Sequence, residues 1–260
     1  MTRVTRTRLT LWVLLGLTLL RLPLAALMRL LLPDESVAPE VNHIAMMAQT
    51  LLMFALPGWL LMCGEKPEPV SKGHLNCLLL AGAAAVLAKL ALPALNTLWC
   101  GLLSLEMPQL PVAQGVLARA LQLLAVAVVP AIAEELFFRG ALLRNLQLQY
   151  GRHTALWLTT LLFALMHGTP GGLPGHIVIS LLLTLLAMHS GSLWAPVTVH
   201  LAYNLLPLQM ERGALGALLL LAVLLALLIR RVPAGGIRPR GREALVCGAI
   251  LLVMAVQYFV

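Results

Sequence analysis

The feature that most constrains this chain is a succession of apolar runs, each about long enough to cross a lipid bilayer. A helix needs about 20 predominantly apolar residues to span the hydrocarbon core. Of the 260 residues, 60% are hydrophobic and only 11% are charged, whereas a typical soluble domain carries about 25% charged residues. Lipid must therefore cover most of the surface, and we predict an all-α fold, a polytopic transmembrane helical bundle.

The apolar windows predict eight or nine spans within a single integral membrane domain, residues 1–260. They lie near residues 9–32, 43–63, 75–96, 114–133, 154–168, 173–190, 193–209, 213–230 and 243–260. The fourth is expected to continue as helix to about residue 149. Several of the later windows are short, so the count is left open. The alternation of polar and apolar residues that is typical of strands does not occur.

The loops between these windows indicate how the chain is oriented. Basic residues gather at 3–8, 139–152 and 230–242, whereas the loop at 33–42 is acidic. Because basic loops face the cytoplasm, we expect a multi-pass protein of a plasma (inner) membrane with a cytoplasmic N-terminus. The net charge of +8 does not indicate nucleic-acid binding, since no basic, water-facing patch is predicted. The lipid bilayer is an expected partner.

Some ionisable side chains have ordinary explanations. Arg21, Lys89 and Arg119 lie within apolar windows, where such side chains usually snorkel to the interface or lie near a helix end. The histidines at span ends and in loops are expected at the interface, with a site position as the alternative for His176, which follows the Gly/Pro-rich stretch at 168–175. None of these residues is needed to explain an activity.

Two adjacent carboxylates stand out in the segment A-I-A-E-E-L-F-F-R-G, residues 131–140. A charged side chain within a bilayer costs about 2.5–3.5 kcal/mol on insertion scales, so Glu134 and Glu135 need a physical reason to be there. Successive helical residues diverge by about 100°, and Arg139 follows Glu135 by four positions, a favourable spacing for an ion pair. Glu134 is then left without a local partner and is free to act on something else. A salt bridge at a helix end is the alternative.

Two further polar clusters follow on later windows. His167, in F-A-L-M-H-G, is the only ionisable group of its span. His200 and Asn204 are four residues apart and therefore share one helix face. Singly, each cluster is explained as a hydrogen-bonded core residue or as a contact between helices. Together, a carboxylate, two imidazoles and an amide are the groups needed to hydrolyse an amide bond.

In this order, the motifs E-E-x-x-x-R, F-x-x-x-H and H-x-x-x-N resemble those of the CAAX-protease and bacteriocin-processing (CPBP, or Abi) family of intramembrane endopeptidases. The resemblance covers residues 115–210, which would form the catalytic core. It implies a CAAX prenyl protease-like hydrolase that cleaves a peptide bond in a membrane-associated protein or peptide. Because the spans are short and the soluble portion is negligible, we expect a prokaryotic protein, and a membrane-anchored peptide substrate in preference to a prenylated one.

The resemblance also implies roles for individual residues. Glu134 would activate the attacking water with help from His167, and Glu135 would support the site. His200 and Asn204 would donate hydrogen bonds to the oxyanion of the tetrahedral intermediate. The supporting positions are Arg139, the partner of Glu135, and Phe163 of the second motif.

A metal-dependent mechanism would use the same residues differently. Glu134, His167 and His200 form a two-histidine, one-carboxylate set of the kind that binds zinc in hydrolases. The family has been described both as metalloproteases and as glutamate-dependent proteases. The H-E-x-x-H zinc motif is absent from the sequence. We favour the metal-free version, without a cofactor, and keep zinc as the alternative.

The sequence lacks the catalytic residues that other kinds of intramembrane protease require. Asp34 is the single aspartate, which excludes an aspartyl dyad, and no G-x-S-x-G motif occurs. The alternative from another functional class is a non-catalytic membrane protein, either a transporter or a bacteriocin-immunity scaffold. Transporters often contain two halves related by inverted repeats, and no such symmetry is visible here.

Overall fold

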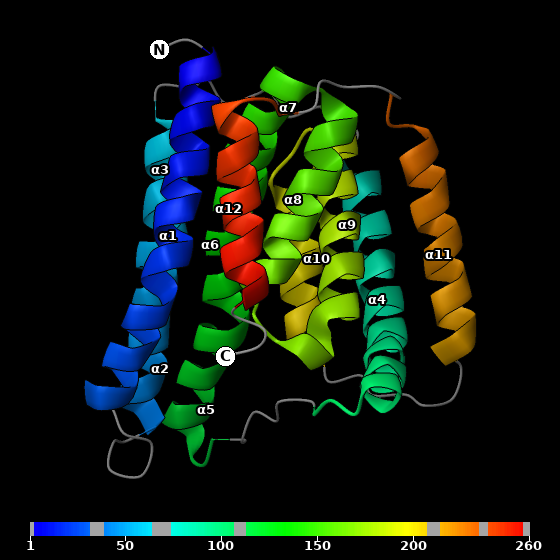
Figure 1. Ribbon diagram of the computed structural model, residues 1–260. Helices are drawn as coiled ribbons and strands as arrows, with labels where there is room; N and C mark the ends of the chain where they lie inside the picture. Colours follow the sequence, from blue (N-terminus) through cyan, green and yellow to red (C-terminus); the bar gives the residue numbers. More distant parts are fainter. Residues whose placement is uncertain are drawn as a thin grey trace.

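The computed structural model describes residues 3–31, 39–63, 74–106, 113–206, 214–233 and 239–256. These described residues form nine helices and contain no strand. In Figure 1 most of the helices run roughly parallel or antiparallel to one another. The predicted all-α helical bundle is therefore confirmed.

Seven of these helices are single elements, and the other two are interrupted by π-helical turns. The single elements are α1 (Arg3–Leu31), α4 (His74–Leu103), α8 (Arg152–Met166), α9 (Leu173–Ser190), α10 (Trp194–Leu205), α11 (Ala214–Arg230) and α12 (Arg242–Val256). The second helix consists of α2 (Pro39–Thr50), the π-helix η1 (Leu51–Ala55) and α3 (Leu56–Met62). The fourth consists of α5 (Val116–Leu123), the π-helix η2 (Leu124–Val128), α6 (Val129–Glu135), the π-helix η3 (Leu136–Leu143) and α7 (Arg144–Tyr150). A short 3-10 turn, η4 (Pro170–Gly172), precedes α9.

Length and apolarity identify this chain as a multi-pass membrane protein. Among the described residues, four helices are long and apolar enough to cross a membrane: Pro39–Met62, Ala81–Leu103, Val116–Tyr150 and Pro170–Ser190. Large apolar side chains such as Leu102 and Leu219 are 71% and 61% exposed, as expected where lipid is the solvent. How many of the other helices also span stays a prediction.

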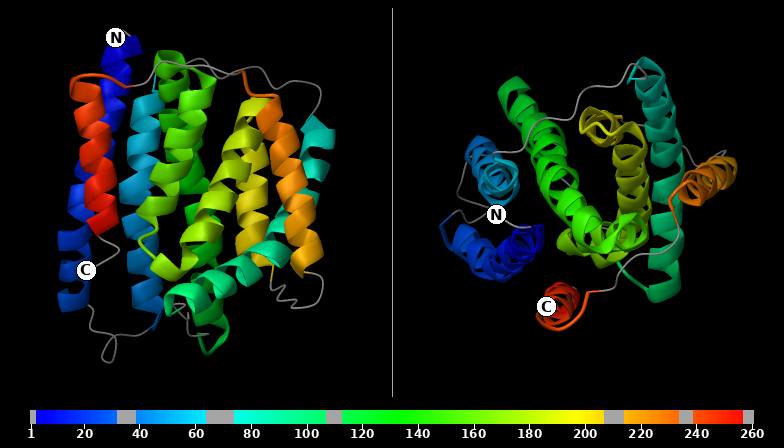
Figure 2. Two further views of the ribbon diagram at one scale, coloured as in Figure 1. Left: turned by 45° about the vertical axis from the view of Figure 1, so that its right-hand side comes forward. Right: turned by 90° about the horizontal axis from the view of Figure 1, so that it is seen from above.

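The fourth helix brings the first polar motif to the middle of the bundle. The apolar window at 114–133 ends before that motif. The helix was predicted to continue to about residue 149, and in the structure it ends at Tyr150. Pro130 lies within it, directly after η2. Figure 2 shows this helix between α1–α3 and α8–α10. The carboxylates at its centre therefore face neighbours on both sides.

Close packing of α3 on η3 depends on a glycine. A Cβ atom on Gly58 would lie 3.0 Å from the backbone N and Cα of Phe137. Beside this contact, the rings of Phe54, Phe137, Phe138 and Phe163 touch one another with centroid distances of 5.1 to 6.0 Å. This aromatic cluster joins the second, fourth and fifth helices and forms the core next to the polar motifs.

The turn between α8 and α9 is held in place by α4. Three α4 side chains bond its backbone, so the turn is fixed from outside the α8–α9 hairpin. Trp99 donates to the Pro170 carbonyl (3.0 Å), the Cys100 thiol donates to the Gly171 carbonyl (3.6 Å), and Asn96 accepts from the Gly175 N–H (2.8 Å).

Candidate active site

Glu135 is the centre of a fully buried polar network. Its Oε1 atom accepts hydrogen bonds from Arg139 Nη1 at 2.8 Å and from His200 Nδ1 at 2.9 Å. The side chains of Glu135 and Arg139 are completely excluded from solvent. This pair follows from the i, i+4 spacing on one helix, and His200 joins it from α10. The network thus ties two of the three motifs together.

Arg139 also connects the fourth helix to α9. Its Nη2 atom donates to the hydroxyl and the carbonyl of Ser180, at 2.9 and 3.1 Å, and lies 3.4 Å from the Thr184 hydroxyl. The guanidinium carbon lies 4.3 Å from the centre of the Phe163 ring, close enough for a cation–π interaction. These contacts supply a buried cation with partners that water would otherwise provide.

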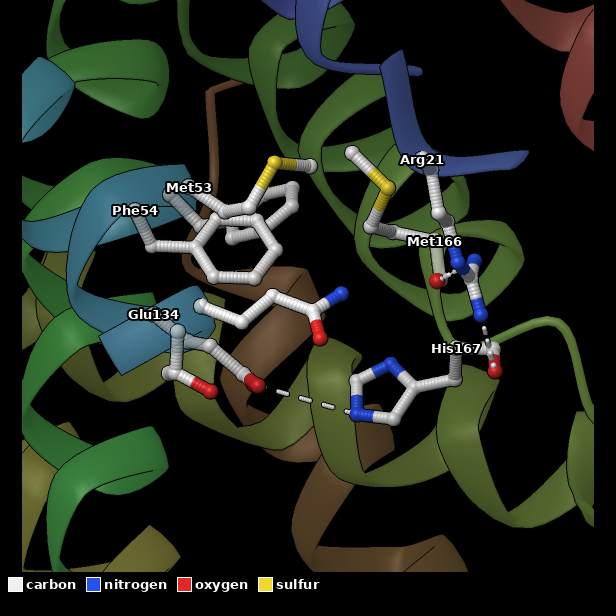
Figure 3. A pocket seen from close by; sticks show the side chains of 9 residues that line it. Arg21, Met53, Phe54, Glu134, Met166 and His167 are labelled. Carbon is white, nitrogen blue, oxygen red and sulfur yellow. Dashed lines mark hydrogen bonds and ion pairs between the residues drawn. The ribbon is translucent and has the colours of Figure 1, made fainter. Parts of the chain in front are cut away.

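Glu134 faces a different partner. Its Oε2 atom lies 3.8 Å from Nε2 of His167, and the two side chains point toward each other (Figure 3). Their side chains are 13% and 27% exposed, so the pair is reachable from the adjoining pocket. Within the part of the chain that the structure describes, Glu134 Oε2 has no hydrogen-bond partner. The structure therefore brings the carboxylate of the first motif together with the imidazole of the second.

The orientation of the His167 ring is fixed on several sides. Nδ1 lies 3.0 Å from the Phe163 carbonyl, and because a carbonyl oxygen only accepts, Nδ1 carries the proton. In the neutral imidazole, Nε2 is then the acceptor, and this atom faces Glu134. The ring also lies against Phe163 at 4.7 Å and stacks on His176 at 4.2 Å.

His176 was expected at the membrane interface, and the structure places it beside His167. Its imidazole stacks on His167 with an angle of 27° between the rings, and its Nδ1 lies 3.3 Å from the Thr169 hydroxyl. A weak signal is present in the sequence, because His176 follows directly on the Gly/Pro-rich turn after His167. It could not show that the turn folds back far enough for the two rings to meet.

A pocket of about 210 Å³ opens beside Glu134 and His167. Half of its wall comes from α1 and the second helix, where the sequence contains no motif that marks functional residues. The lining residues are Arg21, Gln49, Thr50, Met53, Phe54, Glu134, Phe138, Met166 and His167. The sequence did not predict that the first five of these residues belong to the site.

The cations of the apolar windows behave differently from one another. Arg119 lies in the first turn of α5 and donates to the Ala113 carbonyl (3.0 Å), in keeping with a helix-end position. The Lys89 ammonium lies 5.0 Å above the ring of Tyr203. Arg21 points inward, and its guanidinium bonds backbone carbonyls at the end of α8. Arg21 therefore has partners within the bundle, which its apolar window did not predict.

Asn204 lies on the same helix as His200 but meets a different part of the fourth helix. Its amide nitrogen lies 3.4 Å from the carbonyl of Val126. Proline has no N–H, so Pro130 cannot donate to this carbonyl four residues before it. A neighbouring polar side chain commonly satisfies a carbonyl freed in this way inside a membrane. The structure thus gives Asn204 a contact that supports the fourth helix at its proline.

The three residues suggested as zinc ligands are divided between two networks. Glu134 pairs with His167, whereas Nδ1 of His200 is bonded to Glu135. Across the described ranges, no group of three His, Cys, Asp or Glu side chains is placed to hold a metal ion. As arranged, these donors do not form a three-ligand set of the kind zinc hydrolases use.

Comparison with known proteins finds a family model that matches part of the chain. Residues 116–206 match the family model described as type II CAAX prenyl endopeptidase Rce1-like. No curated protein and no solved structure matches the chain. The matched segment contains all three polar motifs, and it confirms the family that those motifs predicted.

Proposed function

We propose that this chain, whose residues 116–206 match the Rce1-like family model, is an intramembrane endopeptidase in which Glu134 and His167 activate water. The family supports a CAAX-protease-like activity in general. The observation that carries the specific proposal is the pairing of Glu134 with His167 at the wall of a pocket, while the adjacent Glu135 is committed to Arg139 and His200.

Two hydrogen-bond acceptors face each other in this pairing. A carboxylate accepts only, and Nε2 of His167 accepts because Nδ1 holds the proton. A water molecule between them would donate one hydrogen to each acceptor and turn a lone pair toward the pocket. This is the geometry that general-base catalysis requires. Two acceptors placed in this way therefore match a nucleophilic water that donates to both.

The reaction then proceeds as an ordinary amide hydrolysis. Water oxygen bonds to the carbonyl carbon of the substrate while its proton passes to Glu134, and the carbonyl oxygen becomes an oxyanion. When the C–N bond breaks, the same proton passes to the departing amine. His167 holds the water in line with Glu134 during the attack, which lowers the entropic cost of reaching the transition state.

We assign the oxyanion to His200 and Asn204. Nδ1 of His200 is bonded to Glu135, which leaves Nε2 as the ring nitrogen that would donate to an oxyanion. The fixed carboxylate of Glu135 orients the ring, just as a buried carboxylate orients a catalytic histidine in other hydrolases. Asn204 would exchange its long contact with Val126 for the oxyanion when substrate binds.

The substrate and setting follow from the same site. We propose a membrane-anchored peptide in preference to a prenylated protein, in a plasma (inner) membrane with the N-terminus in the cytoplasm. A single membrane domain would contain the catalytic core at residues 115–210. We favour catalysis without a metal and keep zinc as the alternative.

The test is cleavage of a quenched fluorogenic peptide with one apolar anchor by the purified protein in proteoliposomes. We expect cleavage by the wild type and its loss in Glu134→Gln and His167→Ala. Glu106→Gln changes an exposed carboxylate, and His153→Ala changes an exposed imidazole on the same helix as His167, so both should retain activity. A prenylated version of the peptide tests the substrate preference.

Three results would redirect the proposal. Equal cleavage by the wild type and Glu134→Gln would remove the assigned mechanism. No cleavage by the wild type would favour a non-catalytic transporter or immunity scaffold. For the metal, 1,10-phenanthroline and elemental analysis are decisive: stoichiometric zinc with chelator-sensitive cleavage would establish the metalloprotease alternative.

A further inference from the structure

We infer that Arg21 on α1 is a positioning residue for His167. This inference rests on the proposed function, because it concerns the imidazole that orients the water. Arg21 lies outside the segment 116–206 that matches the family, yet it lines the same pocket as Glu134 and His167. A charged side chain within an apolar helix costs free energy, so Arg21 is expected to have a partner inside the bundle.

The guanidinium of Arg21 binds the last carbonyls of α8. It donates through Nη1 to the Met166 carbonyl and through Nη2 to the His167 carbonyl, the latter at 3.0 Å (Figure 3). Carbonyls at a helix C-terminus have no partner in the next turn, and a cation suits the negative end of the helix. The planar fork of arginine reaches both oxygens at once, as a lysine ammonium does not.

Gly168, the residue after His167, leaves space for this guanidinium because it has no side chain. Gly168 has a φ of +62°, in the left-handed region that side chains rarely adopt. A Cβ atom at this position would lie 2.7 Å from Nη2 of Arg21. The glycine therefore both turns the chain away from α8 and leaves room for the arginine from α1.

This contact bears on the distance between the catalytic groups. Glu134 belongs to the fourth helix and His167 to the end of α8, so their separation of 3.8 Å depends on how that end is held. Phe163 fixes the His167 ring within its own helix, whereas Arg21 ties its backbone to another helix. Loosening this tie should displace Nε2 from Glu134 without changing either catalytic group.

The kinetic test compares Arg21→Ala and Arg21→Lys with the wild type, using the anchored fluorogenic peptide in proteoliposomes. A displacement of about 1 Å in a catalytic group costs up to about 100-fold in rate, so we expect kcat to fall by about 10- to 100-fold and KM to change by less than about twofold. Arg8→Ala is the matched control, since Arg8 lies on the same helix and bonds Glu243 at 2.8 Å; it should keep the wild-type kcat.

A second variant separates positioning from general damage. Gly168→Ala should lower kcat by forcing the guanidinium away, and it should cost less when Arg21 is already alanine. The loss of kcat in the double variant should be at least about threefold smaller than the product of the two single losses. Such non-additivity is expected of residues in direct contact. Fully independent losses would contradict a shared contact.

A spectroscopic measurement works even without a good substrate. In protein labelled with ¹⁵N-histidine, the His167 signal, identified by its loss in His167→Ala, should shift in Arg21→Lys and stay in place in Arg8→Ala. Arg21→Lys keeps the positive charge and guards the test against a misfolded alanine variant.

The outcomes distinguish this inference from the proposed function. Wild-type kcat in Arg21→Ala and Arg21→Lys, with Glu134→Gln inactive, overturns the positioning role and leaves the function intact. A higher KM at unchanged kcat also overturns it, because Arg21 would then contact substrate. If the wild type cleaves nothing, the proposed function fails, and an unshifted His167 signal in Arg21→Lys overturns the placement of Arg21 by itself.

Discussion

Glu134 and Glu135 are adjacent in the chain, yet their carboxylates belong to two separate networks. Glu135 Oε1 is shared by Arg139 and His200, at 2.8 and 2.9 Å. Glu134 Oε2 instead lies 3.8 Å from His167 at the pocket wall. The rotation of about 100° between successive helical residues produces this division. One carboxylate is fixed and paired with a cation, and the other is available for chemistry.

The two glutamates should therefore respond differently to the same substitution. We expect Glu134→Gln to lower kcat by about 10²–10⁴-fold, the usual contribution of a general base. Its free energy of unfolding should stay close to that of the wild type, because no hydrogen bond to Glu134 Oε2 is lost among the described residues. The measurements are peptide cleavage and unfolding in detergent. A stable Glu134→Gln variant with wild-type kcat would contradict this prediction.

Glu135→Gln should primarily destabilise the fold. It leaves Arg139 charged and without its anionic partner in a completely buried position, and breaking such a pair costs about 3–5 kcal/mol. Arg139→Met in the same chain removes the remaining charge, so the double variant should recover part of this loss. Titration with denaturing detergent measures the free energy of unfolding. Equal stability of Glu135→Gln and the wild type would mean that the pair does not support the fold.

Gly58→Ala tests the close packing of α3 on η3. Its methyl group would meet the Phe137 backbone at 3.0 Å, and crowding of this kind costs about 1–3 kcal/mol. Gly82→Ala is the matched control, because nothing lies within 4 Å of its Cβ position. In a helix, this control should be neutral or stabilising by about 0.5–1 kcal/mol. Similar effects of both variants on the unfolding free energy would refute the packing argument.

We assign Asn204 a proposed catalytic role and a structural role, and a double variant distinguishes them. Asn204→Ala should lower kcat by about 10²–10³-fold through loss of an oxyanion donor, and it should cost about 1 kcal/mol of stability through loss of the Val126 contact. Pro130→Ala restores a backbone N–H four residues after Val126. In the Pro130→Ala background, the stability cost should shrink while the loss of kcat remains. Recovery of kcat in the double variant would leave Asn204 with a structural role alone.

The sequence predicts the fold well because lipid imposes simple rules on the chain. The order of the helices and the all-α class follow from apolar windows, and the three polar motifs predict the family. Helix ends are harder to predict. Polar residues such as Asn96 end the apolar window at 96, although α4 continues to Leu103. Asn96 is tolerated there because it accepts the Gly175 N–H, a contact between residues far apart in the sequence.

The missing part of the site could not be read from local sequence for the same reason. Arg21 is an isolated cation in an apolar run, and its purpose becomes visible only when α1 lies beside the end of α8. His176 is likewise one of several histidines near a span end until the turn stacks it on His167. Both assignments depend on tertiary contacts between segments whose individual patterns have simpler explanations.

The hydrogen bonds between α4 and the segment after His167 limit how far the chain can be truncated around the proposed catalytic core. Three α4 side chains bond this segment, and all three lie outside the residues 116–206 that match the family model: Asn96, Trp99 and Cys100. An excised fragment carrying all three signature motifs would lose those anchors. Any transplant of the proposed catalytic core should therefore include α4, even though none of the three motifs lies on that helix.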